Sequence, residues 1–448
     1  MKKVITYGTF DLLHEGHVNL LRRARELGDY LIVGVTNDSF DRERGKLNVR
    51  NNVLERVESV KATGLVDKVI IEDYVGQKID DIQKYDVDIF AIGSDWQGKF
   101  DYLGEFCQVV YLPRTEGVSS TMLRAESEVM VNIGIVGCGR IASRFVDEAT
   151  KVDAARISAL YDIRREVAVA LSQGDESLVC DSFEELVEKS DAVYIATPHL
   201  EHYAQAKYAL EHGCHVLCET PMVLHGAEAR ELYALARKKG MLLMEANKTA
   251  YCPAFNHLVA LVKSGLIGDV VGVDASESKL WGEDKLRREL DPTQAGGSMY
   301  EMGSYPLLPI LKLLGTDYED VTICSRMNDK GVDVYTRGFV RYARAIASFQ
   351  LGLGVKTEGN LVISGTKGYV YVPSPWWKTD YFELRYEDQN QNKKYFYKWD
   401  EPGLRYELQE FISCIVNNRV SARLTPELSI AMSDVMDQFG KQENLYRI

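Results

Sequence analysis

Short apolar runs alternate with amphipathic helical stretches along the first 126 residues. The run VITYGTF is followed by HVNLLRRARELGD, whose apolar residues fall on one helical face: Val18, Leu20, Leu21, Ala24 and Leu27. The later apolar runs are YLIVGV, KVII, IFAIG and VVYLP. This pattern is typical of an α/β unit with a parallel sheet, in which functional residues lie at the carboxyl ends of the strands.

A second alternation of the same kind begins at VNIGIVG and continues to about residue 246. From Gly268 to Pro373 the texture changes, because apolar and polar residues alternate singly, as in an antiparallel sheet with one open face. Two helical stretches, YELQEFISCIVNN and TPELSIAMSDVMDQ, follow. We therefore expect three domains: residues 1–126 and 130–248, each with a parallel sheet, and residues 249–448, an α+β domain with a mostly antiparallel sheet.

Composition and charge exclude several classes of function. The chain has 448 residues, too many for one core, and a net charge of −13, which does not indicate a nucleic-acid footprint. No apolar run is long enough for a membrane span, and the N-terminus lacks the pattern of a signal peptide. None of the eight cysteines forms a CxxC pair, so reduced thiols in the cytoplasm are expected. A metal site in HGCHVLC is not expected, because strand alternation separates its side chains.

Two motifs stand at the ends of the first unit. GTFDLLHEGH places His14 and His17 at the start of a helix that follows the first strand, where imidazoles and a helix N-terminus attract phosphate oxygens. RTEGVSST, at residues 114–121, offers Arg114, hydroxyls and backbone N–H groups before another helix. A lone HxxH also suits core histidines, but the two motifs together indicate nucleotidyl transfer, which needs phosphates held in line and charge neutralised.

With GSDWQGKFD and the helix that contains Arg56, these motifs make residues 1–125 resemble the HxGH nucleotidyltransferases, in particular those that transfer CMP from CTP to glycerol 3-phosphate. The resemblance implies catalytic roles for His14, His17 and Arg114, and an acceptor-phosphate role for Lys78. It also implies Mg²⁺ with CTP, oriented by Asp11. The CTP-binding positions would be Thr9, Phe10, Asp11, Lys46, Arg56, Asp95, Arg114, Ser119, Ser120 and Thr121. The tryptophan that precedes this lysine in relatives is absent from YVGQK. The acceptor is therefore expected to be a small polyol phosphate whose identity the sequence leaves open.

The second unit opens with strand, Gly137-x-Gly139-x-x-Ala142 and helix, and Asp162 follows after the next strand. This spacing predicts a dinucleotide site in which glycines admit the pyrophosphate and the carboxylate binds ribose hydroxyls. Asp162 favours NAD, whereas Arg164 and Arg165 also suit the 2′-phosphate of NADP. A Rossmann fold without cofactor is the alternative.

ATPHLEHYAQAKYALEHGCHVLCETP and AGGSMYEMGSY make residues 130 to about 440 resemble the glucose–fructose oxidoreductase and inositol dehydrogenase (Gfo/Idh/MocA) family. The resemblance implies an NAD(P)-dependent oxidoreductase, and a homodimer or larger homo-oligomer is expected. The cofactor-binding positions would be Gly137, Gly139, Arg140, Ile141, Asp162, Arg164, Thr197, His199, His202, Glu219, Thr220 and Pro221.

One departure from the family concerns its catalytic lysine, because Glu219-Thr220-Pro221 stands where the family has Glu-Lys-Pro. Either the domain is no longer a redox enzyme, or another acid has replaced the lysine. Lys248, just beyond an apolar strand, is the expected substitute, and its pKa would have to be lowered or its ammonium bonded to the carbonyl oxygen. Tyr305, at the family's histidine position, would relay a proton, and its pKa would be lowered by Lys248. His199 more naturally lines the nicotinamide pocket.

A fusion of two enzymes explains why one α/β unit ends and another begins between Glu126 and Met130. The simplest hypothesis is reduction of a keto- or aldehydo-phosphate to a polyol phosphate, followed by CMP transfer to give a CDP-polyol for teichoic acid or capsule. The alternatives are a redox-inactive second part that binds nucleotide or drives oligomerisation, and oxidation of the CDP-linked product.

Overall fold

The structure is a computed structural model that describes residues 1–38, 51–74, 76–113, 130–152, 154–280, 288–397 and 402–448. The chain divides into two compact units, each described here by itself. The first comprises Met1–Ser127 with Asn256–Leu266, and the second comprises Glu128–Phe255 with Ile267–Ile448. No helix in the described ranges combines the length and apolar character needed to cross a membrane.

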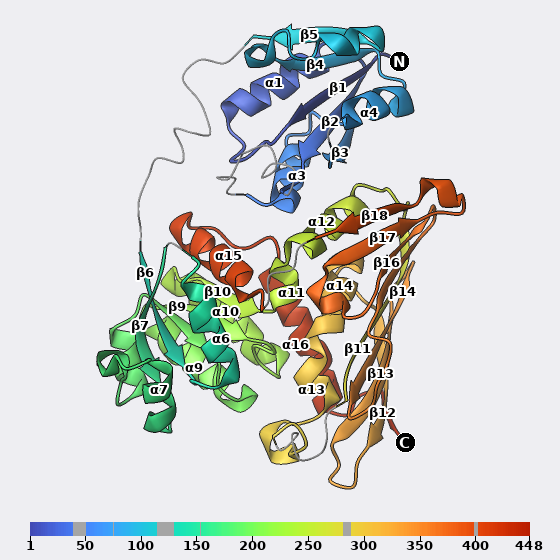
Figure 1. The fold of residues 1–448 in the computed structure, drawn as a ribbon. Helices are drawn as coiled ribbons and strands as arrows, with labels where there is room; N and C mark the ends of the chain where they lie inside the picture. Colours follow the sequence, from blue (N-terminus) through green and yellow to red (C-terminus); the bar gives the residue numbers. More distant parts are fainter. Residues whose placement is uncertain (39–50, 75, 114–129, 153, 281–287, 398–401) are drawn as a thin grey trace. The chain divides into compact units, whose positions relative to one another are not determined.

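The first unit is built on a parallel sheet of five strands in the order β3-β2-β1-β4-β5 (Figure 1). Its strands are β1 (Lys3–Gly8), β2 (Tyr30–Thr36), β3 (Lys68–Glu72), β4 (Ile89–Gly93) and β5 (Gln108–Leu112), and its helices include α1 (Glu15–Arg25), α3 (Val53–Ala62) and α4 (Gln77–Tyr85). Ile5, Ile32 and Phe90 fill the core beneath the helices. The strand order reverses between β1 and β4, and ligands bind beyond the carboxyl ends of strands at such a point.

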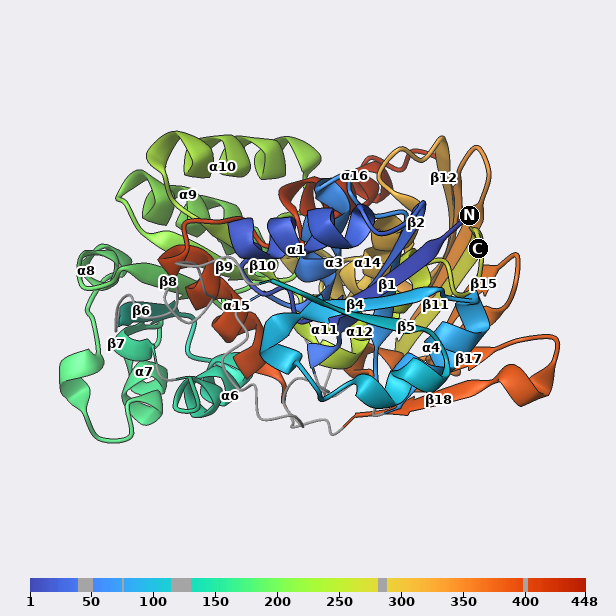
Figure 2. The same cartoon turned by 90° about the horizontal axis from the view of Figure 1, so that it is seen from above.

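A second parallel sheet, in the order β10-β9-β8-β6-β7, lies in the second unit. Its strands are β6 (Val131–Val136), β7 (Ala155–Tyr161), β8 (Ala192–Ile195), β9 (His215–Glu219) and β10 (Leu243–Ala246). The helices are α6 (Arg140–Ala149), α7 (Arg165–Leu171), α8 (Phe183–Glu188), α9 (His202–Glu211) and α10 (Gly226–Lys239). The side chains of α8, α9 and α10 form one core with Val193 and Ile195, and α9 and α10 lie side by side in Figure 2. Tyr194 points to the opposite face, where its ring stacks on Phe145 of α6 with centroids 3.8 Å apart.

The third sheet has nine strands in the order β18-β17-β16-β15-β11-β14-β13-β12-β19. They are β11 (Val270–Lys279), β12 (Asp320–Met327), β13 (Asp333–Arg341), β14 (Ile346–Leu353), β15 (Leu361–Gly365), β16 (Tyr369–Val372), β17 (Tyr381–Arg385), β18 (Lys393–Phe396) and β19 (Leu445–Arg447). Every pair is antiparallel except β11 with β14 and β12 with β19. The predicted fold class, two parallel sheets followed by a mostly antiparallel one, is confirmed.

The remaining helices are α11 (Lys248–Tyr251), α12 (Pro253–Lys263), α13 (Ser298–Met302), α14 (Ser304–Leu314), α15 (Leu404–Val416) and α16 (Pro426–Gly440). Figure 1 shows α13 and α14 against one face of the nine-stranded sheet. Side chains on its other face alternate with buried ones along β13, where Phe339 is exposed between Gly338 and Val340. The single alternation of the sequence therefore reflects a sheet covered on one face.

Candidate functional site

The loop after β1 carries the two histidines of the first unit to the start of α1. Phe10 and Leu12 turn the chain with φ angles of 53° and 47°. His14 is the N-cap of α1, and its Nδ1 accepts a hydrogen bond of 3.1 Å from the backbone of Gly16. The rings of His14 and His17 stack with centroids 3.9 Å apart. Burial lowers the pKa of His14, so the imidazole is neutral at neutral pH and carries its proton on Nε2.

The carboxyl ends of β1 and β4, which are paired in the sheet, bring the next predicted residues to the same edge. Thr9 and Asp11 follow β1, and Asp95 lies in the short helix η1 (Ser94–Trp96) directly after β4. Asp11 is buried and accepts a hydrogen bond of 2.9 Å from the backbone of Asn51. The edge where the strand order reverses therefore carries imidazoles, carboxylates and a helix N-terminus together.

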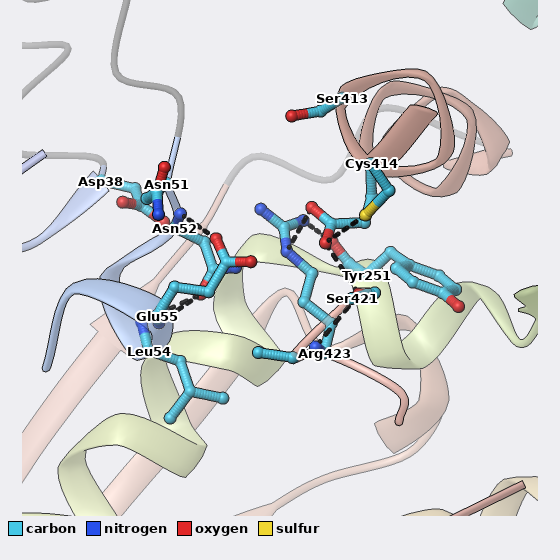
Figure 3. A network of polar contacts seen from close by, with 12 residues as sticks. Asp38, Asn51, Asn52, Leu54, Glu55, Tyr251, Ser413, Cys414, Ser421 and Arg423 are labelled. Carbon is cyan, nitrogen blue, oxygen red and sulfur yellow. Dashed lines mark hydrogen bonds and ion pairs between the residues drawn. The ribbon is translucent and has the colours of Figure 1, made fainter. Parts of the chain in front are cut away.

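Arg56 is fully buried, and α3 places it beneath this edge. An N-cap pair starts the helix: Asn52 Oδ1 accepts from the backbone of Glu55, whose carboxylate accepts from the backbone of Asn52 (Figure 3). The Arg56 guanidinium donates to the carbonyls of Thr9 and Thr36 at 2.6 and 2.8 Å, and it pairs with Asp38. Its described contacts hold the loop after β1 in place. The predicted positions Lys46, Arg114, Ser119, Ser120 and Thr121 lie outside the described residues.

Lys78, on the first turn of α4, is a buried residue of the same unit with polar neighbours. Its ammonium pairs with Glu72 and lies 4.6 Å from the centroid of the Tyr7 ring. Gln77, which precedes it, donates to the carbonyl of Ile71 at 2.6 Å and to Asp81 at 2.9 Å. The hydrogen-bonded side-chain amide of Gln77 thus lies directly before Lys78, at the position where relatives were expected to have a tryptophan.

The glycine motif of the second unit lies between β6 and α6. Gly137 has a φ of 85°, and a Cβ there would lie 2.7 Å from the carbonyl oxygen of Ala196, so the turn admits no side chain. Gly139 caps α6, and among the described residues no atom lies within 4 Å of its Cβ position. Arg140 and Ile141 form the first turn of that helix. The N-terminus of α6 is thus open to an anion.

Asp162 follows β7 and faces this turn. Its two carboxylate oxygens accept hydrogen bonds from the backbones of Cys138 and Arg164, each at 2.9 Å. The Arg164 side chain lies 65% exposed, with Nε 3.8 Å from the carboxylate. These residues fit a dinucleotide, because the carboxylate fixes the glycine turn and also presents negative charge beside it.

The loop after β8 places two buried histidines near the cofactor turn. His202 has Nδ1 2.9 Å from the carbonyl of Pro221 and Nε2 2.9 Å from that of Thr197, so it joins two strand ends. His199 Nδ1 lies 3.9 Å from Glu301 Oε1, too far for a hydrogen bond. Burial lowers the pKa of both histidines, that of His199 strongly. The ring of His199 is therefore neutral at neutral pH, whereas a neutral His202 ring could donate to only one of its two carbonyls.

Arg288 completes the group around Glu301. Its Nη2 donates to Glu301 Oε2 at 2.9 Å. Within the part of the chain that the structure describes, His199 Nδ1, Glu301 Oε1 and Arg288 Nη1 are buried without a hydrogen-bond partner. An oxygen atom of a ligand, such as a hydroxyl group, suits three such atoms.

The ends of β9 and β10 carry the residues around the missing lysine. Thr220 Oγ1 donates to Glu245 Oε1 at 2.8 Å, so the threonine hydroxyl is engaged in a hydrogen bond to a buried carboxyl group. Glu219 accepts from the hydroxyl of Tyr194, and burial raises its pKa to about 7. Lys248 begins α11, and burial lowers its pKa while the carboxyls of Glu277, Glu407 and Glu219 oppose that effect. A lysine with a lowered pKa is what the expected acid–base role requires.

The expectation that the pKa of Tyr305 is lowered is wrong. Burial raises the pKa of Tyr305 well above its usual value, and the nearby carboxyls of Glu277, Glu219 and Glu407 raise it further. Because burial and the carboxyl groups act in the same direction, Tyr305 keeps its proton at neutral pH and can donate a hydrogen bond but not act as a phenolate.

Sequence reasoning missed Glu277, Glu407 and Arg288. Glu277 is 1% exposed on β11, and Glu407 is fully buried on α15. The signal for Glu407 was present, because it shares a helical face with buried Leu404, Leu408 and Phe411. A glutamate on the apolar face of a helix is a candidate functional residue.

Comparisons with known proteins match two different families, one before and one after the segment between residues 126 and 131. Residues 5–126 match the cytidylyltransferase-like family. Glycerol-3-phosphate cytidylyltransferase of Bacillus spizizenii is 52% identical over 126 residues, which are 28% of this chain and 97% of that protein. The corresponding enzyme of Staphylococcus aureus is 51% identical over 126 residues, 28% of this chain and 95% of that protein.

The remainder matches oxidoreductases. Residues 131–247 match the oxidoreductase family with an NAD-binding Rossmann fold, and residues 255–371 match the GFO/IDH/MocA C-terminal domain. The scyllo-inositol 2-dehydrogenase (NADP⁺) of Bacillus subtilis is 27% identical over 328 residues, 70% of this chain and 97% of that protein. A 3-ketoreductase from Actinomadura kijaniata, solved with NADP and TDP-benzene, shares the fold with a TM-score of 0.64 at 20% identity, over 71% of this chain and 99% of that one.

Proposed function

The chain belongs to the cytidylyltransferase-like family through residues 5–126 and to the Gfo/Idh/MocA oxidoreductase family through residues 131–371, and from this premise we propose one bifunctional enzyme. Its second unit reduces a keto- or aldehydo-phosphate with NAD(P)H. Its first unit then transfers CMP from CTP to the resulting small polyol phosphate, releasing pyrophosphate. The product is a CDP-polyol of the kind used for teichoic acid or capsule.

The stacked histidines at the start of α1 carry the first half of the proposal. CTP would bind where the strand order reverses, with its phosphates over the N-terminus of α1. His14 and His17 would donate hydrogen bonds to the phosphate oxygens as charge develops during transfer. Mg²⁺ with CTP, oriented by Asp11, would neutralise the triphosphate. Lys78 would bind the phosphate of the acceptor, in a pocket that Gln77 shapes.

The second half rests on the open turn at Gly139 and on Lys248. A nicotinamide cofactor would lie over the N-terminus of α6 with its ribose at Asp162, and when bound it supplies the hydride. Thr197, His199, His202 and Pro221 would line its nicotinamide end. Lys248 would then give a proton to the substrate oxygen, and Tyr305 would donate a hydrogen bond to it. Glu301 with Arg288 would bind a neighbouring hydroxyl group.

A redox-inactive second unit is the alternative reading. The hydrogen bond of Thr220 to Glu245 favours it, because a neutral hydroxyl cannot stabilise an oxyanion as the family's lysine does. In that case the second unit would serve as a nucleotide-binding or oligomerisation platform.

We also propose self-association through the open face of the nine-stranded sheet. Phe339 and Ser348 are paired across β13 and β14, so Phe339 and Ile346 share one face. These two side chains are 52% and 63% exposed. Apolar side chains on an uncovered sheet are typical of an interface with a second copy.

Reciprocal variants of the full chain test the two halves separately. His17→Ala should lower CTP-dependent pyrophosphate release by ~10²–10³-fold, because donors to a developing charge are worth that much, and it should leave reduction unchanged. Lys248→Ala should abolish reduction, Tyr305→Phe should impair it, and CMP transfer should persist in both.

The matched controls are His212→Ala and Lys239→Ala, which change exposed residues. Normal CMP transfer by His17→Ala would remove the first assignment, and normal reduction by Lys248→Ala would remove the second. If the unmodified chain reduces no carbonyl compound, the platform reading holds.

A further inference from the structure

Three carboxyl groups from separate elements act electrostatically on the ammonium of Lys248. Glu219 ends β9, Glu277 lies on β11, and Glu407 lies on α15, and each of them interacts electrostatically with the lysine. Lys279, also on β11, is the nearby second cation. Within the described ranges, Lys248 makes no hydrogen bond or ion pair of its own. Its charge is therefore stabilised by several groups at a distance and not by one direct partner.

Burial of two of these carboxyl groups lowers the stability of the fold. Glu277 is 1% exposed and Glu407 is fully buried. Among the residues described, Glu277 Oε2 and both carboxyl oxygens of Glu407 lack a hydrogen-bond partner. Buried polar atoms are nearly always bonded, because an unbonded one forfeits its hydration without compensation. The hydrogen bonds of the fold therefore do not explain these three oxygen atoms. The other oxygen of Glu277, Oε1, lies 3.9 Å from the ammonium of Lys279.

A group of polar contacts, here called the clamp, joins α11 to α15 and consists of Arg423, Glu410, Ser421 and the carbonyl of Tyr251. Arg423 Nη1 donates to the carbonyl of Tyr251, the last residue of α11, at 3.1 Å, and its Nε lies 3.3 Å from Glu410 of α15 (Figure 3). Ser421 donates to the same carboxylate at 2.7 Å. Lys248 lies three residues before Tyr251, and Glu407 three residues before Glu410. Each of the two residues therefore lies about one helical turn before a residue of the clamp on the same helix, so the clamp restricts the positions of Lys248 and Glu407.

We propose that Glu277 and Glu407 are positioning residues of the oxidoreductase site, whose carboxyl groups keep the buried Lys248 ammonium charged and oriented as the proton donor. This rests on the proposed role of Lys248 in reduction. As hydride reaches the carbonyl carbon, the carbonyl π electrons move to oxygen, and the oxygen takes a proton from Lys248 Nζ. Lys248 becomes a neutral amine and regains a proton from solvent.

The electrostatics of the cluster agree with this role. Burial alone lowers the pKa of Lys248, and the carboxyls of Glu277, Glu407 and Glu219 act in the opposite direction, while Lys279 lowers it. Burial raises the pKa of Glu277 to about 7, and it raises that of Glu407 well above its usual value. Each of these carboxyl groups, once ionised, favours the ammonium form of Lys248.

The test is the pKa of Lys248 in the full chain without substrate or cofactor. Lysines are dimethylated with ¹³C-formaldehyde, the methyl signal of Lys248 is assigned from Lys248→Arg, and its shift is followed against pH. Glu407→Gln and Glu277→Gln should each lower the pKa of Lys248 by about one unit, since each removes a carboxylate that favours the ammonium. The alkaline limit of the reduction rate should move to lower pH by the same amount, and Glu407→Asp should restore part of it.

Asp333→Asn is the matched control. It changes a buried carboxyl that is bonded to Ser298 and the backbone of Met299, and the pKa of Lys248 should not move. An unchanged pKa in both glutamine variants would overturn the proposal. A lowered pKa without a shift of the rate profile would reject Lys248 as proton donor and leave the nicotinamide chemistry standing. Absence of any reduction by the unmodified chain would instead reject the proposed function.

Discussion

Asp162 combines two tasks at a single residue. Its carboxylate fixes the turn after β6 by accepting from the backbones of Cys138 and Arg164. In the proposed complex it would also place negative charge beside the adenosine ribose, where the 2′-phosphate of NADP would lie. Arg164 is close enough to offset part of that charge, with Nε 3.8 Å away. We therefore propose that the charge of this residue decides the choice of cofactor, while the shape of the turn depends on the same side chain.

Asp162→Asn removes the charge and keeps one of the two oxygen atoms that accept from the backbones of Cys138 and Arg164. We expect the ratio of the dissociation constants for NADPH and NADH to fall about fivefold, since ~1 kcal/mol of repulsion at about 4 Å is removed. Fluorescence titration with each reduced cofactor measures this ratio. Asp181→Asn, which changes an exposed carboxylate paired with Arg165, is the control. An unchanged ratio in Asp162→Asn would show that this residue does not select the cofactor.

The sequence predicts the helices and strands better than it predicts how these elements pack on one another. Periodicity predicted the strands and helices of both parallel sheets, and with them Gly137, Gly139 and Lys248, because these follow strands directly along the chain. It did not predict that β11 pairs in parallel with β14, or that α15 packs on α11. Glu277 and Glu407 are brought to Lys248 only by those contacts, which join segments far apart in the sequence. Pattern within one segment therefore located the cofactor turn but not the cluster.

The raised pKa of Glu277, on β11, should make the stability of the fold depend on pH. A carboxyl whose pKa is about 7 in the fold and about 4.5 when unfolded stabilises the fold fully below pH 4.5, and this contribution is lost as pH rises to about 7. The loss is on the order of 3 kcal/mol. Glu277→Gln is neutral throughout, so its melting temperature relative to the unmodified chain should rise between about pH 4 and pH 8.

Calorimetry of the full chain at several pH values measures this difference. Glu358→Gln, which changes an exposed residue of the same unit, should show no such rise. A constant difference for Glu277→Gln would mean that the fold does not raise the pKa of Glu277. The same substitution should impair reduction, so stability would be gained where function is lost.

At the scale of the whole molecule, two sites with different chemistry occupy separate compact units of one chain. The first matches enzymes that make a CDP-linked polyol, and the second matches oxidoreductases with an NAD-binding fold. Joining them in one chain fixes equal amounts of the two units. In the proposed function, their substrates are related as carbonyl compound and alcohol. The central claim is therefore that the product of the second unit is the acceptor of the first.

A coupled assay with the unmodified chain tests this claim most directly. Triose, tetrose and pentose keto-phosphates are each supplied with NADH or NADPH, CTP and Mg²⁺, while cofactor oxidation is followed by absorbance and nucleotide products by mass spectrometry. We predict that one keto-phosphate gives equal amounts of oxidised cofactor and CDP-polyol, and that omission of the reduced cofactor abolishes the CDP-polyol. CDP-polyol formed only from added polyol phosphate, with no cofactor oxidised for any carbonyl compound, would contradict the account.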